Sequence, residues 1–238
     1  MVKPDIIMCY PNNCDFPLWR TSLGLNRDRY NEVIIAITET NSPQNYTEHI
    51  KQSLSHLHVQ FVIPPPTLPG EDWRNVATNM CLLHSYNAEW ILFTEQDFII
   101  TDYPAFFEEI EEAATYGYKV MGYYEGTRLH PCFILIHRSE LAPLKKVFSI
   151  IPNAHDHFYQ IQKQLDDKIT PIYKVANNCY HLNGLSSNMS LVERGGQPNY
   201  KPQEFYDYIQ DSLQNMNLSP VWTKTFTTWQ QTYHDNLR

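Results

Sequence analysis

No apolar run in this chain approaches the length of a membrane span, and the first residues, Met1–Asp5, do not read as a signal peptide. We therefore expect a cytoplasmic protein without an integral membrane segment. Cysteine is sparse: the five thiols are an odd number and include no CxxC pair, which argues against a disulfide framework or a zinc site. Basic residues are also few, with 18 against 26 acidic ones and a net charge of −8. That balance argues against binding to nucleic acid, which needs a basic face to neutralise phosphates.

The residues that are present suit a folded enzyme-sized domain. Of 238 residues, 42% are hydrophobic and 18% are charged, which is typical of a globular protein with one or two domains. An acidic protein can still bind a nucleoside diphosphate if a divalent cation bridges the two negative partners. The charge balance therefore directs attention to candidate metal ligands.

Short apolar runs alternate with stretches of helical periodicity along the chain. We expect strands at Asp5–Tyr10, Glu32–Thr38, Val59–Ile63, Trp90–Thr94, Lys119–Tyr123, Cys132–His137 and Ile169–Val175, and helices around 73–83, at Pro104–Tyr116 and at Phe158–Leu165. Because strands that alternate with helices are connected by crossovers, we predict an α/β fold with a mostly parallel central sheet flanked by helices. Residues 1–195 would form this domain, and residues 196–238 a C-terminal helical extension packed on it.

The strongest local feature is the segment WILFTEQDFII, in which an apolar strand runs directly into Glu95-Gln96-Asp97. Ligands bind at the carboxyl ends of strands in open α/β sheets. Two carboxylates one residue apart in an extended segment point the same way and repel each other unless a cation holds them. We therefore predict a site for Mn²⁺ or Mg²⁺ that accepts a diphosphate. The alternative is a polar loop after a buried strand.

In the order of its elements, about residues 5–190, the chain resembles the GT-A nucleotide-sugar glycosyltransferases of the family-2 type, which have a Rossmann-like fold. Their first strand and helix correspond to Ile6–Tyr10 and Pro17–Leu25, and a helix with an Arg and an Asn at its start corresponds to the run from Arg74 to Asn79. The family's D-x-D motif reads Glu95-Gln96-Asp97 here, with Glu in place of the first Asp.

This resemblance implies a set of binding residues. The nucleotide contacts would come from Tyr10, Thr38, Glu39, Arg74, Asn79 and Glu95. Asp97 would hold the metal ion, with Glu95 near the ribose or the ion. His181, in the place of a late histidine of the family, would be a further ligand, and imidazole suits a borderline ion such as Mn²⁺. A structural histidine beside the Asn183-Gly184 turn is the alternative for His181.

Two carboxylates are candidates for the general base. Asp156 precedes a predicted helix and resembles the family's acidic helix start beside the acceptor, where a carboxylate takes the proton of the acceptor hydroxyl. Asp156 is equally suited to be a helix N-cap. Glu125 is the second choice, in the loop that precedes the strand starting near His130-Pro131.

We therefore expect a metal-dependent glycosyltransferase, of the hexosyltransferase type and inverting, that uses a UDP-, GDP- or dTDP-sugar and an unidentified hydroxyl acceptor. A sugar nucleotidyltransferase of similar fold is an alternative, but it would carry a glycine-rich loop after the first strand, and Tyr10-Pro-Asn-Asn-Cys14 has no glycine. A non-catalytic protein that binds nucleotides or carbohydrates is the other alternative.

Overall fold

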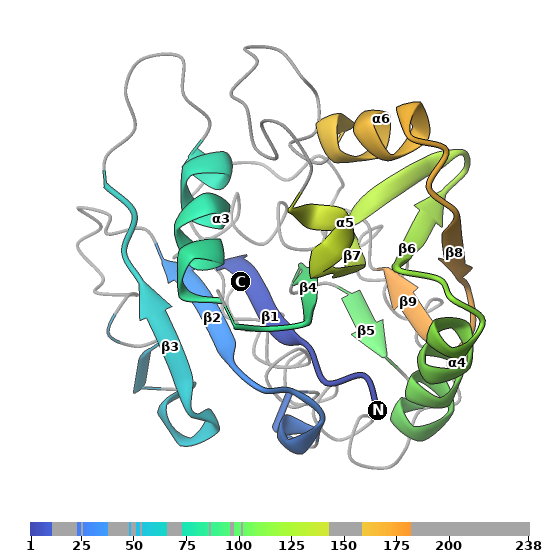
Figure 1. Cartoon of the computed structure of the whole chain (residues 1–238). Coiled ribbons are helices and arrows are strands. Elements are labelled where there is room, and N and C mark those ends of the chain that lie inside the picture. The colour runs from blue at the N-terminus through green and yellow to red at the C-terminus, as the bar shows by residue number, and fades with distance from the viewer. Residues whose placement is uncertain are drawn as a thin grey trace, which may run out of the picture.

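The computed structural model describes residues 1–10, 23–24, 26–37, 48, 51–52, 54–65, 73–85, 87–95, 98–100, 102–142 and 159–181. In this part of the chain, a seven-stranded sheet has the order β3-β2-β1-β4-β7-β6-β8, and β5 and β9 form a second, two-stranded sheet (Figure 1). The strands are β1 (Asp5–Tyr10), β2 (Val33–Ile37), β3 (Val59–Val62), β4 (Trp90–Thr94), β5 (Phe98–Ile100), β6 (Val120–Glu125), β7 (Arg128–His137), β8 (Ile172–Val175) and β9 (Cys179–His181).

The large sheet is mostly parallel, as the sequence predicts. β1 pairs in parallel with β2 and β4, β2 with β3, and β6 with β8. β7 alone among these strands runs against its neighbours β4 and β6. The reversal follows from the short turn between β6 and β7, because a turn of this length can join only antiparallel strands.

Helices cover both faces of the sheet. The longer ones are α3 (Trp73–His84), α4 (Tyr103–Thr115) and α6 (Tyr159–Asp167), and η1 (Arg27–Arg29), η2 (Ser55–Leu57) and α5 (Arg138–Leu141) are single turns. Two apolar clusters result. One contains Met8, Phe106 and Phe133, and the other contains Ile7, Ala77 and Ile161. Adjacent residues of β1 fall in opposite clusters because successive side chains of a strand point to opposite faces.

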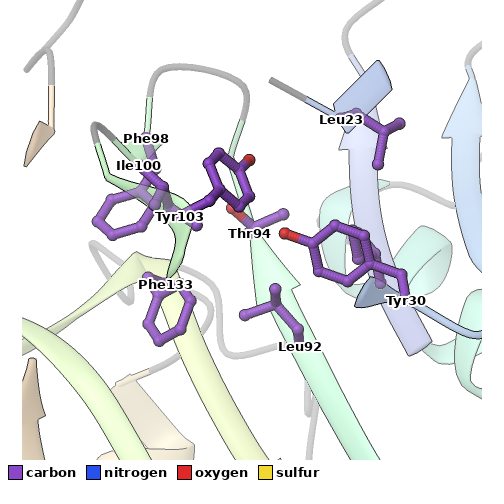
Figure 2. Close-up of a pocket in the computed structure, with 9 residues that line it drawn as sticks. Leu23, Tyr30, Leu92, Thr94, Phe98, Ile100, Tyr103 and Phe133 are labelled. Atoms are coloured by element: carbon purple, nitrogen blue, oxygen red, sulfur yellow. The ribbon is translucent and has the colours of Figure 1, made fainter. Parts of the chain in front are cut away.

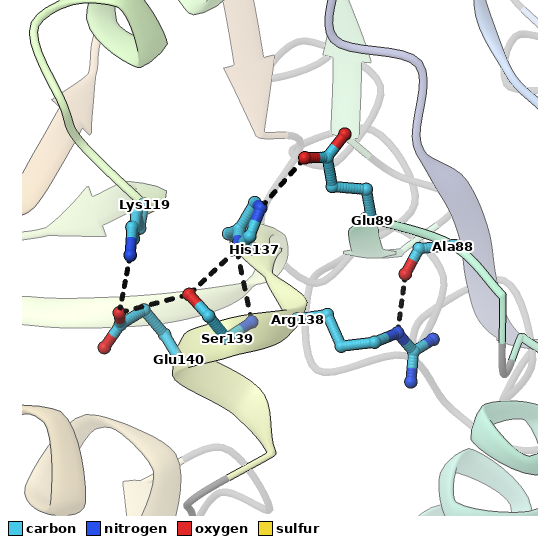
Figure 3. A network of polar contacts seen from close by, with 7 residues as sticks. All are labelled: Ala88, Glu89, Lys119, His137, Arg138, Ser139 and Glu140. Atoms are coloured by element: carbon cyan, nitrogen blue, oxygen red, sulfur yellow. Dashed lines mark hydrogen bonds and ion pairs between the residues drawn. The ribbon is translucent and has the colours of Figure 1, made fainter.

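A network of hydrogen bonds and ion pairs lies at the edge of the sheet where β4 begins and β7 ends (Figure 3). Arg138 donates hydrogen bonds from Nε to the carbonyl of Ala88 at 2.5 Å and from its guanidinium to the carbonyl of Ser85. His137 caps α5 by accepting from the amide of Ser139 at 3.2 Å, and its Nε2 lies 3.3 Å from Glu89. These contacts tie the segment between α3 and β4 to the end of β7.

Most of the expected elements are present, with five main differences. β5, β9 and α5 were not predicted, β7 begins four residues before the predicted strand, and β8 begins three residues after the start of the strand predicted at Ile169–Val175, because the chain from Lys168 to Thr170 forms the cap of α6. The predicted C-terminal extension, residues 196–238, lies outside the described residues. No helix in the part of the chain that the structure describes has both the length and the apolar character to cross a membrane.

Candidate functional site

The carboxyl ends of six strands meet at one edge of the large sheet, opposite the Arg138 network. This edge carries the ends of β1, β2, β3, β4, β6 and β8, and because β7 is antiparallel, its first residue, Arg128, lies there too. Ligands of open α/β sheets bind outside this edge. The functional candidates Glu95 and Glu125 follow or end two of these strands.

Two carboxylate–imidazole pairs lie together at this edge. Oε2 of Glu95 is 3.9 Å from Nε2 of His181, and Oε2 of Glu125 is 3.7 Å from Nε2 of His130. The two imidazole rings connect the pairs, with centroids 4.3 Å apart and planes tilted by 45°. Four ionisable side chains from the ends of β4, β6, β7 and β9 thus form one group, which we call the Glu–His cluster.

The turn between β6 and β7 positions Glu125 and His130. Gly126 has φ of 62°, a left-handed conformation that glycine adopts without steric cost. Gln162 of α6 holds the two sides of the turn, since its Oε1 accepts from the amide of Leu129 at 3.0 Å and its Nε2 donates to the carbonyl of Thr127 at 3.4 Å. Pro131 has no amide hydrogen, and the strand continues through it to Cys132.

The small sheet brings His181 to the Glu–His cluster. His181 pairs with Phe98 in the antiparallel ladder of β5 and β9. Phe98 stacks on Phe133 of β7, with ring centroids 5.0 Å apart and an interplanar angle of 30°. His181 is therefore carried by a strand that rests on the same part of β7 as His130, and it is 5% exposed.

Glu95 is fixed through its backbone. Its amide donates to the carbonyl of Cys132 at 3.2 Å, and the hydroxyl of Thr94 donates to the same carbonyl at 2.9 Å. The amide of Phe98 donates to the carbonyl of Glu95 at 3.3 Å. This bond connects the end of β4 to the start of β5, and Gln96 and Asp97, which the sequence analysis expects to be extended, lie outside the described residues.

A cavity of about 20 Å³ lies between β4, β5 and the start of α4 (Figure 2). Its walls include Phe98 and Phe133, and the hydroxyl-bearing side chains of Thr94, Tyr30 and Tyr103 reach it. A cavity of at least about 10–15 Å³ with polar partners can hold one water, so this one suits a buried water rather than a substrate. Burial, with the nearby Tyr103, raises the pKa of Tyr30 well above its usual value, which keeps the hydroxyl neutral.

The remaining predicted site residues are less informative. Asn79 is exposed in the middle of α3, and for Tyr10 and Arg74 the structure describes the backbone alone, at the end of β1 and in the first turn of α3. Thr38, Glu39, Asp97 and Asp156 lie outside the described residues. Of the predicted site, the structure thus brings together Glu95, Glu125 and His181.

Cys132 was not among the predicted site residues, yet it lies against both histidines. The ligand atoms of His130, Cys132 and His181 are all within 4.8 Å of one another. Residues 130 and 132 of one strand point to the same face. The His-Pro-Cys spacing was therefore the sequence signal that could have placed Cys132 beside His130. The contribution of His181 depends on the pairing of β9, which the sequence analysis did not predict.

The sequence matches no protein-family model and no curated protein. Solved structures do match in fold. One is mannosyltransferase PcManGT from Pyrobaculum calidifontis in complex with GDP-Man and Mn²⁺, with 12% identity over 99% of this chain and 74% of that one and a TM-score of 0.53. Another is glucosyl-3-phosphoglycerate synthase from Mycobacterium tuberculosis in complex with Mn²⁺, UDP and phosphoglyceric acid, with 14% identity, 83% and 80% coverage and a TM-score of 0.52.

A third similar structure is a putative glucose-1-phosphate thymidylyltransferase from Bacillus anthracis in complex with a sucrose, with 9% identity, 85% and 98% coverage and a TM-score of 0.51. At these identities the similarity establishes the fold. The expected GT-A architecture, with its mostly parallel sheet flanked by helices, is confirmed.

Proposed function

We propose that this chain is a metal-dependent glycosyltransferase that moves a sugar from a nucleotide diphosphate sugar to a hydroxyl acceptor in the cytoplasm. The observation that carries the proposal is the Glu–His cluster, which lies where strands of a GT-A fold end. The similar mannosyltransferase and the similar synthase were both solved with a nucleotide ligand and Mn²⁺, which supports a donor of this class.

The described residues fit a divalent ion. Glu95 offers carboxylate oxygens, and His181 places an imidazole nitrogen 3.9 Å from one of them. Carboxylate oxygen suits both Mg²⁺ and Mn²⁺, whereas an added imidazole favours Mn²⁺. We propose Asp97 as a further ligand. A bound ion would neutralise the charge that develops on the diphosphate leaving group.

The nucleotide would bind over the ends of β1 and β2. Tyr10 is in register with Ile37, so these two strands end together, and Thr38 and Glu39 follow Ile37 directly. We propose that Tyr10, Thr38 and Glu39 contact the nucleoside.

Arg74 and Asn79, on the helix that follows β3, complete the proposed donor site. Arg74 would supply positive charge to the diphosphate, because a guanidinium binds phosphate oxygens through two parallel hydrogen bonds.

We propose that Asp156 removes the proton from the acceptor hydroxyl, with Glu125 as the second candidate. The carboxylate would take the proton of the acceptor hydroxyl while the oxygen forms its bond to the anomeric carbon. Glu125 is half-exposed beside His130, so an acceptor can reach it from solvent. Because one carboxylate would act alone, without a covalent intermediate, we propose that the reaction inverts the anomeric configuration.

A sugar nucleotidyltransferase is the second candidate, since a putative thymidylyltransferase has a similar fold. The products distinguish the two. A glycosyltransferase releases a nucleoside diphosphate from a nucleotide-sugar, whereas a nucleotidyltransferase releases pyrophosphate from a nucleoside triphosphate and a sugar 1-phosphate. We expect nucleoside diphosphate release from one member of a panel of UDP-, GDP- and dTDP-sugars with Mn²⁺.

Binding of UDP and GDP by calorimetry, in EDTA and in Mn²⁺, tests the metal claim. We expect the affinity for one nucleotide to be at least about tenfold higher with Mn²⁺, because the ion bridges an acidic protein and an anionic ligand. Glu95→Gln should remove most of this gain. Glu125→Gln, its matched control, should retain it. Equal affinities in the two buffers would refute metal dependence.

A further inference from the structure

His130, Cys132 and His181 form a compact group of nitrogen and sulfur donors. Their ligand atoms lie within 4.8 Å of one another, and each residue is at most 9% exposed. His130 and Cys132 come from the same face of β7, and β9 supplies His181. The group therefore rests on two paired strands rather than on one loop.

Each imidazole has a carboxylate near its Nε2 atom. Nε2 of His130 faces Glu125 at 3.7 Å, and its Nδ1 accepts a hydrogen bond from the amide of Cys132 at 3.2 Å, which places the lone pair of this ring on Nδ1. Nε2 of His181 likewise faces Glu95 at 3.9 Å, and its Nδ1 is buried. A carboxylate at one nitrogen and a metal ion at the other is the usual arrangement around histidine ligands. At His130 the ion would take the Nδ1 lone pair in place of the Cys132 amide, because the neutral ring has only one such lone pair.

The donor types point to a particular class of ion. A thiolate with two imidazoles suits Zn²⁺ and related borderline ions, whereas Mg²⁺ and Mn²⁺ prefer oxygen. In a tetrahedral site with Zn–N of about 2.0–2.1 Å and Zn–S of about 2.3 Å, neighbouring ligand atoms are roughly 3.3–3.6 Å apart. The ligand atoms here lie within 4.8 Å of one another, so the side chains would move closer together when an ion binds.

We propose that His130, Cys132 and His181 form a binding site for Zn²⁺ or Co²⁺, with a water molecule as the fourth ligand. On binding, the Cys132 thiol releases its proton to the buffer, and the thiolate sulfur donates an electron pair to the ion. The CxxC pattern is absent from the sequence, and the site uses a single cysteine instead.

Zn²⁺ binding at this site would inhibit the enzyme. This consequence rests on the proposed function, in which His181 is a ligand of the Mn²⁺ site. An ion on Nδ1 of His181 leaves Nε2 protonated and unable to bind a second ion, so the two sites compete for one side chain.

Titration with Co²⁺ tests the site without any assay of activity. We expect a thiolate-to-cobalt charge-transfer band in the near ultraviolet, saturating at one ion per chain, and displacement of Co²⁺ by Zn²⁺. In Cys132→Ala the band should be absent, because the thiolate ligand is removed. The Zn²⁺ affinity should be lower by roughly 100-fold or more, since loss of a partner that only orients a ligand already costs about 10–100-fold.

Cys81→Ala is the matched control, since Cys81 and Cys132 are both 0% exposed but lie in opposite core clusters. It should bind Co²⁺ with the band intact. His130→Asn is a second test that keeps an acceptor for the Cys132 amide, and it should weaken Co²⁺ binding while melting like the parent protein. An unchanged band or Zn²⁺ affinity in Cys132→Ala would overturn the site.

The competition between Zn²⁺ and Mn²⁺ is tested separately, by measuring the affinity for Mn²⁺. In the parent protein, Zn²⁺ should lower the affinity for Mn²⁺, and Cys132→Ala should resist this effect. If Co²⁺ and Zn²⁺ bind as expected while no nucleotide-sugar is turned over, the metal site stands and the proposed function fails. If Zn²⁺ binds and leaves Mn²⁺ affinity unchanged, the competition is wrong.

Discussion

At the scale of single residues, the two glutamates of the Glu–His cluster differ in their exposure. The side chain of Glu95 is 33% exposed and that of Glu125 is 50% exposed, although each faces an imidazole at a similar distance. A more enclosed carboxylate loses less entropy when it binds an ion, and a more open one is accessible to an acceptor. This difference underlies the roles proposed for them.

The general base is testable because the two candidates give different outcomes. We expect Asp156→Asn to lower turnover by about 10²–10⁴-fold, since the proton acceptor is lost. Donor affinity and melting temperature should change little, because Asn caps a helix about as well as Asp. Steady-state kinetics and calorimetry on the same preparation measure these quantities.

Glu125→Gln serves as the counterpart of that variant. If Asp156 is the base, Glu125→Gln should retain most of the turnover and alter mainly the KM of the acceptor. The reverse pattern, with full turnover in Asp156→Asn and a large loss in Glu125→Gln, would assign the base to Glu125.

At the scale of elements, the end of α6 has an unusual residue in its cap. The amide of Thr170 donates to the carbonyl of Leu165 at 3.0 Å, and the amide of Ile169 donates to the backbone carbonyl of Asp166 at 3.0 Å. These two bonds are the pattern of a Schellman motif. The position with left-handed φ in that motif usually holds glycine, but here it is Ile169, with φ of 57°. The side chain is 90% exposed and therefore gains little from packing.

We expect Ile169→Gly to stabilise the protein. A left-handed conformation costs a residue with a β-carbon roughly 1–2 kcal/mol, and glycine's greater freedom in the unfolded chain offsets part of the gain. The net increase in the free energy of unfolding should be about 1 kcal/mol, measured by urea denaturation. Ile169→Val is the control, since it keeps the branched side chain and should change little. Equal stability of the glycine variant and the parent would contradict the strain.

Two of the strands that the sequence predicted correctly have several consecutive buried residues. All five residues of β2 and of β4 are buried, and such runs fit a strand covered on both faces. β5 and β9 have three residues each, too few to show a period. β7 was predicted too short because Arg128, His130 and Pro131 interrupt its apolar pattern.

The candidate site was predictable in part for the same reason. Glu95 follows a readily predicted strand, so its place at the ligand-binding edge could be inferred. The contact of His130 with His181 depends on β9, which the sequence did not indicate, and on the packing of Phe98 against Phe133. Contacts that join distant segments through short strands leave no local pattern in a single sequence.

At the scale of the whole molecule, the two core clusters hold ionisable groups in their neutral forms. Burial raises the pKa of the Cys81 thiol far above its usual value of 9.0, and burial likewise raises the pKa of the Tyr30 hydroxyl above its usual value of 10.0. In the unfolded chain both groups would lose their protons at these usual values. Above them, the unfolded state binds fewer protons than the folded state, so stability falls as the pH rises.

We therefore expect the free energy of unfolding to decrease from about pH 9 upward, by about 1.4 kcal/mol per pH unit for each group that stays protonated in the fold. Urea denaturation between pH 8 and pH 11 measures this slope. Tyr30→Phe should make the decrease above pH 10 shallower, because the ring remains while the hydroxyl is removed. Tyr116→Phe changes a side chain that is 75% exposed and should leave the slope as it is. A slope that does not respond to Tyr30→Phe would contradict this role of Tyr30.

The strand pairings also set an order in which the molecule can be completed while a ribosome makes it. β1, β2 and β3 can pair as soon as Val62 has emerged, and β4 can then join β1. β7 can pair with β6 only after the turn at Gly126 has formed, and β9 can pair with β5 only after His181 has emerged. A nascent chain that ends after β8 can therefore possess the full large sheet and still lack one histidine of the Glu–His cluster.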